Sequence, residues 1–156
     1  MPFSILRAPA RAAALVALLG VSVSQRLALG QAAVAPASTS RVQILNPLDS
    51  AQLTGRSVPV VLQVEGVAIA PVAVQRQGTA HYHLFLDRDL TPLDSAIPTA
   101  VSGIVHLNRG QSWYTFEGLL PGPHRLIAVL ADPKHVPLKP LVADTVHFTV
   151  RQKSRR

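Results

Sequence analysis

Six histidines are the side chains in this sequence whose type and spacing are best suited to chemistry. Two of them, His81 and His83, are separated by one residue in the run Ala-His-Tyr-His-Leu-Phe-Leu. Side chains two positions apart on a β-strand project from the same face of the sheet. Because neutral imidazole is a common ligand of transition metals, the pair predicts two nitrogen ligands for one ion.

Further ligands have to come from another strand or loop. His106 lies at the end of a predicted strand, and His135 lies in the loop sequence Asp-Pro-Lys-His-Val-Pro. Asp87 and Asp132 offer carboxylates, whereas the positive charge of Lys134 beside His135 counts against a cation site. The candidate metal ligands are His81, His83, His106, His135 and Asp132, with Cu or Zn as the ion.

The remaining two histidines fit structural roles. His124 follows a Pro-Gly-Pro turn, a pattern found at the corner between consecutive strands of Ig-like sandwiches, and we expect its ring to anchor that turn by a hydrogen bond. His147 alternates with apolar residues and is expected to face solvent. An alternative stays open for all six: they hold loops together in a structural or partner-binding module that binds no metal.

Signatures of catalysis are missing from the sequence. It has no G-x-S-x-G nucleophile elbow, no glycine-rich phosphate loop and no H-E-x-x-H metalloprotease motif. Cysteine is also missing, which excludes disulfides, thiolate metal sites, cysteine nucleophiles and a lipoprotein anchor. We therefore expect a non-enzymatic protein whose histidines bind a transition metal or a small ligand.

The first 30 residues have the pattern of a signal peptide. Arg7 and Arg11 precede the apolar run 12–23, which is short for a membrane span of about 20 residues. Small residues place cleavage near Gly30 or Ala35, which predicts a periplasmic or secreted protein without a stable membrane span; an uncleaved anchor is the alternative. The predicted division is a signal peptide at 1–30, a linker at 31–40, a β-domain at 41–150 and a basic tail at 151–156.

The distribution of charge gives no sign of a nucleic-acid partner. The formal charge of +7 includes three arginines in the first 30 residues, where no acidic residue occurs. The rest of the chain has 12 basic and 8 acidic residues, and four of the basic residues lie in the tail. Because no stripe of basic and aromatic residues is present, we expect no nucleic-acid binding and leave a protein partner open.

After residue 41 the hydrophobic pattern has period two, with frequent turn-forming residues and no helical stretch. The predicted strands are Arg41–Leu45, Val58–Val64, Ala80–Leu86, Val101–Leu107, Ser112–Phe116, His124–Leu130 and Asp144–Val150. Pro59 predicts an edge or a bulge in the second strand, and the proline-rich segment 88–100 predicts a long loop. About seven strands in one domain predict an all-β fold, an antiparallel Ig-like β-sandwich.

Several separated motifs in this body resemble one family. The segments concerned are Thr79–Asp87, Ile104–Gln111, Pro121–Leu126, Ala131–Pro137 and Val146–Val150. They are similar, in this order, to the histidine-rich motifs of the bacterial domain-of-unknown-function family numbered 4399, over residues 42–150. The resemblance implies an exported, Ig-like domain with no established reaction, and the family's density of histidines looks like a metal or cation site.

The chain departs from the family's motifs at three positions that are histidines there. They are Tyr82 in the H-x-H segment and Pro133 and Leu138 in the loop around His135. Fewer candidate ligands therefore remain in this chain. The set that we favour is His83, His106 and His135, with His81 or Asp132 as the fourth ligand.

Overall fold

The computed structural model describes residues 39–152 of the chain. The predicted signal peptide at 1–30, residues 31–38 of the predicted linker and residues 153–156 of the tail lie outside the described part. The described residues form nine strands and no helix. The strands are β1 (Arg41–Asn46), β2 (Ala51–Thr54), β3 (Val58–Glu65), β4 (Ala68–Ile69), β5 (Thr79–Leu86), β6 (Ile104–Leu107), β7 (Trp113–Phe116), β8 (Gly122–Ala131) and β9 (Ala143–Arg151). Between residues 39 and 152, accordingly, no long apolar helix is available to span a membrane.

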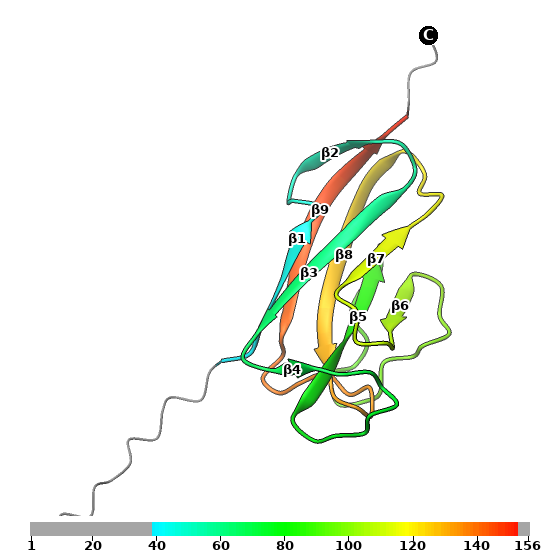
Figure 1. Ribbon diagram of the computed structural model, residues 1–156. Helices are drawn as coiled ribbons and strands as arrows, with labels where there is room; N and C mark the ends of the chain where they lie inside the picture. Colours follow the sequence, from blue (N-terminus) through cyan, green and yellow to red (C-terminus); the bar gives the residue numbers. More distant parts are fainter. Residues whose placement is uncertain (1–38, 153–156) are drawn as a thin grey trace, which may run out of the picture. The chain divides into compact units, whose positions relative to one another are not determined.

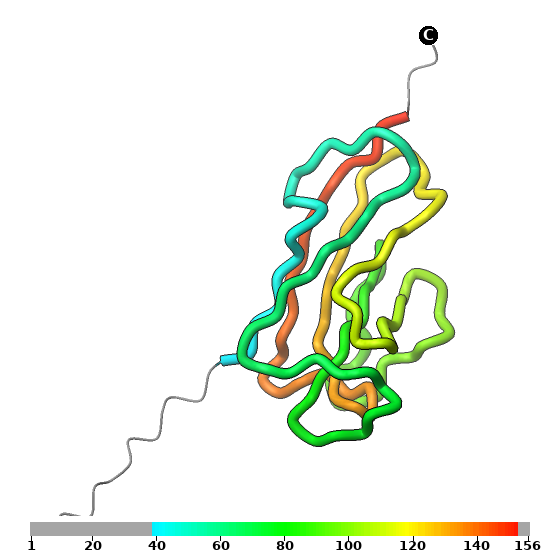
Figure 2. Tube along the Cα trace, in the orientation of Figure 1, coloured from blue at the N-terminus to red at the C-terminus, as the bar shows by residue number. Residues whose placement is uncertain are grey.

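The strands form two sheets that face each other (Figure 1). β1, β3 and β7 make a three-stranded antiparallel sheet with β3 in the middle. The second sheet has six strands in the order β2-β9-β8-β5-β4, and β6 also pairs with β5. Its long strands β5, β8 and β9 pair antiparallel. The trace in Figure 2 shows the two ends of the described chain at opposite ends of this sandwich.

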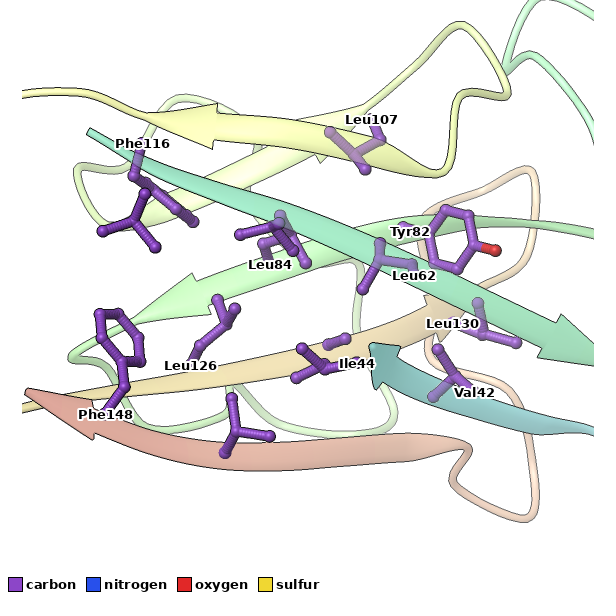
Figure 3. Packing of buried hydrophobic residues seen from close by; sticks show 14 of the residues in the cluster. Val42, Ile44, Leu62, Tyr82, Leu84, Leu107, Phe116, Leu126, Leu130 and Phe148 are labelled. Atoms are coloured by element: carbon purple, nitrogen blue, oxygen red, sulfur yellow. The ribbon is translucent and has the colours of Figure 1, made fainter. Parts of the chain in front are cut away.

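Alternation along the strands builds the core between the two sheets. In β3, Val58, Val60 and Leu62 are buried, and the residues between them are exposed. Figure 3 shows Leu62, Ile44 and Leu126 among the side chains that fill the space between the strands. Aliphatic side chains supply most of this core, and removing their apolar surface from water is the main favourable contribution to folding.

β5 differs from the other strands because both of its faces are buried. Ala80, Tyr82 and Leu84 belong to the core between the sheets, whereas Phe85 belongs to a second, smaller cluster. The buried members of this second cluster are Phe85, Ile97, Ile104, Ile127, Val129 and Ala131. Ile97 comes from the long connection between β5 and β6, so this connection covers the outer face of the six-stranded sheet.

The predicted all-β sandwich is confirmed, and the structure adds two strands that the sequence did not predict. β2 and β4 are short edge strands that pair in parallel with β9 and β5, so the sandwich is mostly rather than wholly antiparallel. Segments this short show no hydrophobic period. The predicted strand at 101–107 begins only at Ile104, because Gly103 has a φ of 81°, which is outside the extended range of a strand. A Cβ at this position would lie 2.9 Å from the carbonyl oxygen of Leu86, so the position favours glycine.

Pro59 does not lie in an edge strand, because β3 is the middle strand of its sheet. Pairing between β3 and β1 ends at Val61, so the N–H that Pro59 lacks interrupts no bond to β1. β1 itself has an irregular register between Ile44 and Asn46, at the point nearest to Pro59. The edge interpretation is therefore wrong, and the irregularity that the proline predicts is found in the neighbouring strand.

Replacing Leu126 by alanine should lower the free energy of unfolding by about 2–5 kcal/mol, because the change leaves a cavity at a fully buried position. Urea denaturation of an untagged chain from residue 31 measures this loss. The matched control is Leu120→Ala, since Leu120 is 68% exposed and its truncation should change stability by less than about 0.5 kcal/mol. Similar losses in both variants would contradict the assigned core.

Candidate metal centre

β5 and β6 place three histidine rings on the outer face of the six-stranded sheet. His81 and His83 leave β5 on the same side as Phe85 of the second cluster. His83 is directly opposite His106 in the antiparallel β5–β6 pair. Their rings stack, with centroids 4.8 Å apart and planes inclined by 13°. The register of one strand pair therefore brings together histidines that are far apart in the sequence.

The fourth ring comes from the β8–β9 connection, which folds back against the end of β8. His135 has a φ of 67°, a left-handed conformation that is uncommon for residues other than glycine. Asp132 stabilises the loop around it, because its Oδ1 atom accepts hydrogen bonds from the N–H groups of Lys134 at 2.8 Å and Val136 at 2.9 Å. These bonds hold the loop in the conformation that presents the ring of His135.

Ring nitrogens from three of these residues meet at one point. His81 Nε2 lies 3.1 Å from His83 Nε2 and 3.3 Å from His135 Nδ1, and the last two atoms are 3.4 Å apart. The centroid of the His106 ring lies 4.8 Å from that of His81 and 4.6 Å from that of His135. One possible ligand atom from each of the four rings lies within 4.8 Å of the others. We call His81, His83, His106 and His135 the four-histidine cluster.

Burial favours the neutral form of these rings. His81 and His83 are 1% and 0% exposed. Burial lowers the pKa of His81 to about 4; the charges of His106 and His135 act in the same direction, and the Asp132 carboxylate opposes them. Burial lowers the pKa of His83 to about 3, and it also lowers the pKa of His106. At neutral pH these three rings are uncharged, and each has a lone pair that can bind a cation.

Two further ring nitrogens in the cluster lack a partner. His83 Nδ1 and His106 Nε2 are buried, and neither has a hydrogen-bond partner among the described residues. A buried polar atom left without a partner costs about 1–3 kcal/mol. Unpaired atoms of this kind are few in native proteins, so two of them in one cluster are unusual.

Neither candidate carboxylate joins the four rings. Asp132 directs its Oδ1 atom at amide groups of its own loop. Asp87 lies elsewhere, with Oδ2 2.7 Å from Nδ1 of His124. The other nitrogen of His124 is 2.8 Å from the carbonyl oxygen of Leu120, so this ring anchors the turn as the sequence predicts. His147 is exposed, also as predicted.

The segment between β5 and β6 contributes to the site in a way that the sequence analysis missed. Its proline-rich pattern correctly predicts a long loop, but Ile97 within it is 2% exposed and packs in the second cluster beside the histidines. The N–H of Ile97 also donates a hydrogen bond of 2.9 Å to the carbonyl oxygen of His135. The consecutive apolar residues Leu84, Phe85 and Leu86 at the end of β5 are the signal that could have revealed a cover on its outer face.

Comparison with known families identifies the family of this chain. The family model described as "Domain of unknown function (DUF4399)" matches residues 60–151, which is more than half of the chain. The chain belongs to this family. The match includes β5 to β9 and all members of the four-histidine cluster. The resemblance found in the sequence is thus confirmed, and the description of DUF4399 names no activity. No curated protein matches the chain.

Solved structures similar to this DUF4399 chain include other β-domains. An engineered protein is 13% identical with a TM-score of 0.45, and the match covers 74% of this chain and 21%, about a fifth, of that one. The fibronectin(III)-like modules of Clostridium thermocellum CbhA are 12% identical with a TM-score of 0.44, covering 72% of this chain and 99% of that one. The PKD domain of human KIAA0319 is 15% identical with a TM-score of 0.43, and the match covers 75% of this chain and 85% of that one. These likenesses carry nothing about function.

Acidification should destabilise the metal-free domain between pH 6.5 and 5. The folded-state pKa values of His81 and His83 lie below the ordinary value of 6.5, so the unfolded chain binds more protons in this range. The stabilisation is complete above pH 6.5 and is lost as the pH falls, by on the order of 1 kcal/mol per pH unit for each ring. Urea denaturation in the presence of EDTA at several pH values measures the slope.

His83→Leu should make the free energy of unfolding less dependent on pH, by the contribution of one histidine ring. The reason is that leucine at this position takes up no proton on unfolding. The same change at the exposed His147, which is outside the cluster, should leave the slope as it is. An unchanged slope in His83→Leu would show that burial of the cluster does not control the pH dependence.

Proposed function

We propose that this DUF4399 domain is exported and binds one transition-metal ion through the four-histidine cluster, without catalysing a reaction. The observation that carries the proposal is the triangle formed by His81 Nε2, His83 Nε2 and His135 Nδ1, with sides of 3.1, 3.3 and 3.4 Å. Three features support it: the protonation states that these nitrogens can adopt, the distances between them, and the presence of a fourth histidine ring.

Hydrogen bonds alone cannot satisfy this triangle. Each nitrogen carries either a proton or a lone pair, so at least two of the three atoms are in the same state. Two lone pairs, or two N–H groups, repel each other at about 3 Å. A cation at the centre resolves the conflict, because all three atoms can then direct lone pairs at it.

His124 shows what a structural histidine looks like in this domain. Its two nitrogens lie 2.7 Å from the carboxylate of Asp87 and 2.8 Å from the carbonyl oxygen of Leu120. Both of these partner atoms are oxygens that accept hydrogen bonds. The nitrogens of the four-histidine cluster are directed at each other instead, or at no partner among the described residues. This contrast favours a metal site over the alternative of histidines that only hold loops together.

The spacing of the three nitrogens suits a tetrahedral or trigonal ion. Zn–N bonds of about 2.0–2.1 Å place tetrahedral ligand atoms about 3.3 Å apart, close to the three sides of the triangle. Four protein ligands would also close the coordination sphere. Closed sites bind or stabilise, whereas catalytic zinc sites keep a position open for water or substrate. The cluster therefore supports a binding role rather than catalysis.

Export is the part of the proposal that depends on residues 1–30. Their basic start, short apolar run and small residues support a signal peptide and a periplasmic or secreted domain. A cysteine-free site of histidine ligands suits that compartment, because it has no thiolate to be oxidised. Cell fractionation with an antibody against the domain tests this part, and full-length protein in the cytoplasm would contradict it.

A zinc titration of the untagged chain from residue 31 should give one tight site per molecule. His83→Ala removes one of four ligands and should weaken the affinity by roughly 100-fold, or about 2.7 kcal/mol. Competition with a chromophoric chelator measures both values. His147→Ala is the matched control, because this histidine is exposed and outside the cluster. Equal affinity in the two variants, or binding without stoichiometry, would refute the metal site.

The role of Asp132 can be separated from that of a ligand. Asp132→Asn keeps a carbonyl oxygen that can accept the N–H groups of Lys134 and Val136, so zinc affinity should change by less than about threefold. Asp132→Ala removes the acceptor, loosens the loop of His135 and should weaken binding by about 10-fold or more. Equal, large losses in both variants would indicate that the carboxylate itself binds the ion.

A further inference from the structure

The four-histidine cluster offers an ion no negative charge in its ligands. All four donors are imidazole rings, and burial holds His81 and His83 in the neutral form. Asp132 is the carboxylate that acts on the cluster, and its Oδ1 atom already accepts two amide N–H groups. Lys134 in the same loop adds a positive charge. A bound ion would therefore keep nearly all of its own charge.

Such surroundings favour an ion of low charge. The cost of moving an ion out of water rises with the square of its charge, so a dication costs about four times as much as a monocation of the same size. His81 and His83 are almost completely buried, and the second cluster lines the same face of the sheet. Water is thus largely excluded from the inner side of the site, where its screening would otherwise reduce the difference.

The arrangement of the nitrogens points in the same direction. Cu²⁺ prefers tetragonal sites, in which ligands at about 2.0 Å lie about 2.8 Å apart when adjacent and about 4 Å apart when opposite. The three nitrogens of His81, His83 and His135 are 3.1, 3.3 and 3.4 Å apart. None of these separations matches the distance between adjacent or between opposite ligands of a tetragonal site. This near-equilateral set suits an ion with a filled d shell, which takes trigonal or tetrahedral ligands without loss.

Strand pairing prevents the site from flattening around Cu²⁺. β5 pairs with β8 and β6 along the stretch that carries His81 and His83. His106 is held opposite His83 by the same pairing, and their rings are stacked. A change toward tetragonal geometry would have to move rings that both sheet hydrogen bonds and packing hold in place.

Among the first-row transition metals, the ion with a single positive charge and a filled d shell is Cu⁺. We propose that the four-histidine cluster is a site for copper in the +1 state, which it stabilises over Cu²⁺. This inference rests on the proposed metal-binding function and adds to it the identity and oxidation state of the ion. It assigns the cluster to holding or delivering reduced copper.

The test compares the protein with a flexible peptide of the same H-x-H sequence. Copper is added to the untagged chain from residue 31, and the Cu²⁺/Cu⁺ potential is measured by voltammetry. An acetylated peptide of residues 79–87 gives the reference, because its rings are free to adopt tetragonal geometry. If the fold favours Cu⁺ over Cu²⁺ by about 100-fold relative to the peptide, the potential of the protein is about 120 mV higher, at 59 mV for each factor of ten.

Two variants connect this shift to the cluster. His135→Ala opens one position to water and should lower the potential toward that of the peptide, whereas His147→Ala should leave it unchanged. One copper per molecule with a potential no higher than the peptide's would overturn the inference and leave the metal-binding function in place. If neither Cu⁺ nor zinc binds with one-to-one stoichiometry, both proposals fall together.

Discussion

β5 has to bury both of its faces, and much of the structure depends on this constraint. One face contributes Tyr82 and Leu84 to the core between the sheets. The other face is covered by Ile97 and by the β8–β9 connection. A strand in this position normally carries apolar residues on both faces, because a polar group without water needs a partner. His81 and His83 occupy the outer face, and the partners within their reach are other histidines.

This burial gives the cluster its chemical character. Rings out of water hold protons weakly, so the pKa of His81 and that of His83 move well below the ordinary range. The same loss of solvent leaves lone pairs that water does not satisfy. Neutral rings that converge without hydrogen bonds for all of their nitrogens are costly for the empty domain, and a bound cation would remove this cost. The physical properties that destabilise the cluster by itself are those that suit it to a metal.

The sheet and the loops contribute to the site in different ways. β5 and β6 hold three rings through strand pairing, so the positions of these rings are as rigid as the sheet. His135 depends on a loop that Asp132 and the backbone of Ile97 hold by hydrogen bonds. His106 and His135 are half-buried and form the side of the cluster nearest to solvent. The residues around the loop therefore control how well the fourth ring is presented.

The sequence by itself determined seven of the nine strands, the β-sandwich and the shared face of His81 and His83, because period-two patterning and turn residues are local properties. It also identified the family, from separated motifs in the right order. It also predicted the anchoring role of His124, since a corner residue is recognised from its turn. It missed β2 and β4, which are too short to show a period, and it could not choose between His81 and Asp132 as the fourth member. Only the tertiary structure decided which residues converge. The β5–β6 register and the cover over β5 are set by contacts between residues distant in the chain. The hydrogen bonds that occupy Asp132 depend on the conformation of its loop, which the sequence pattern does not reveal.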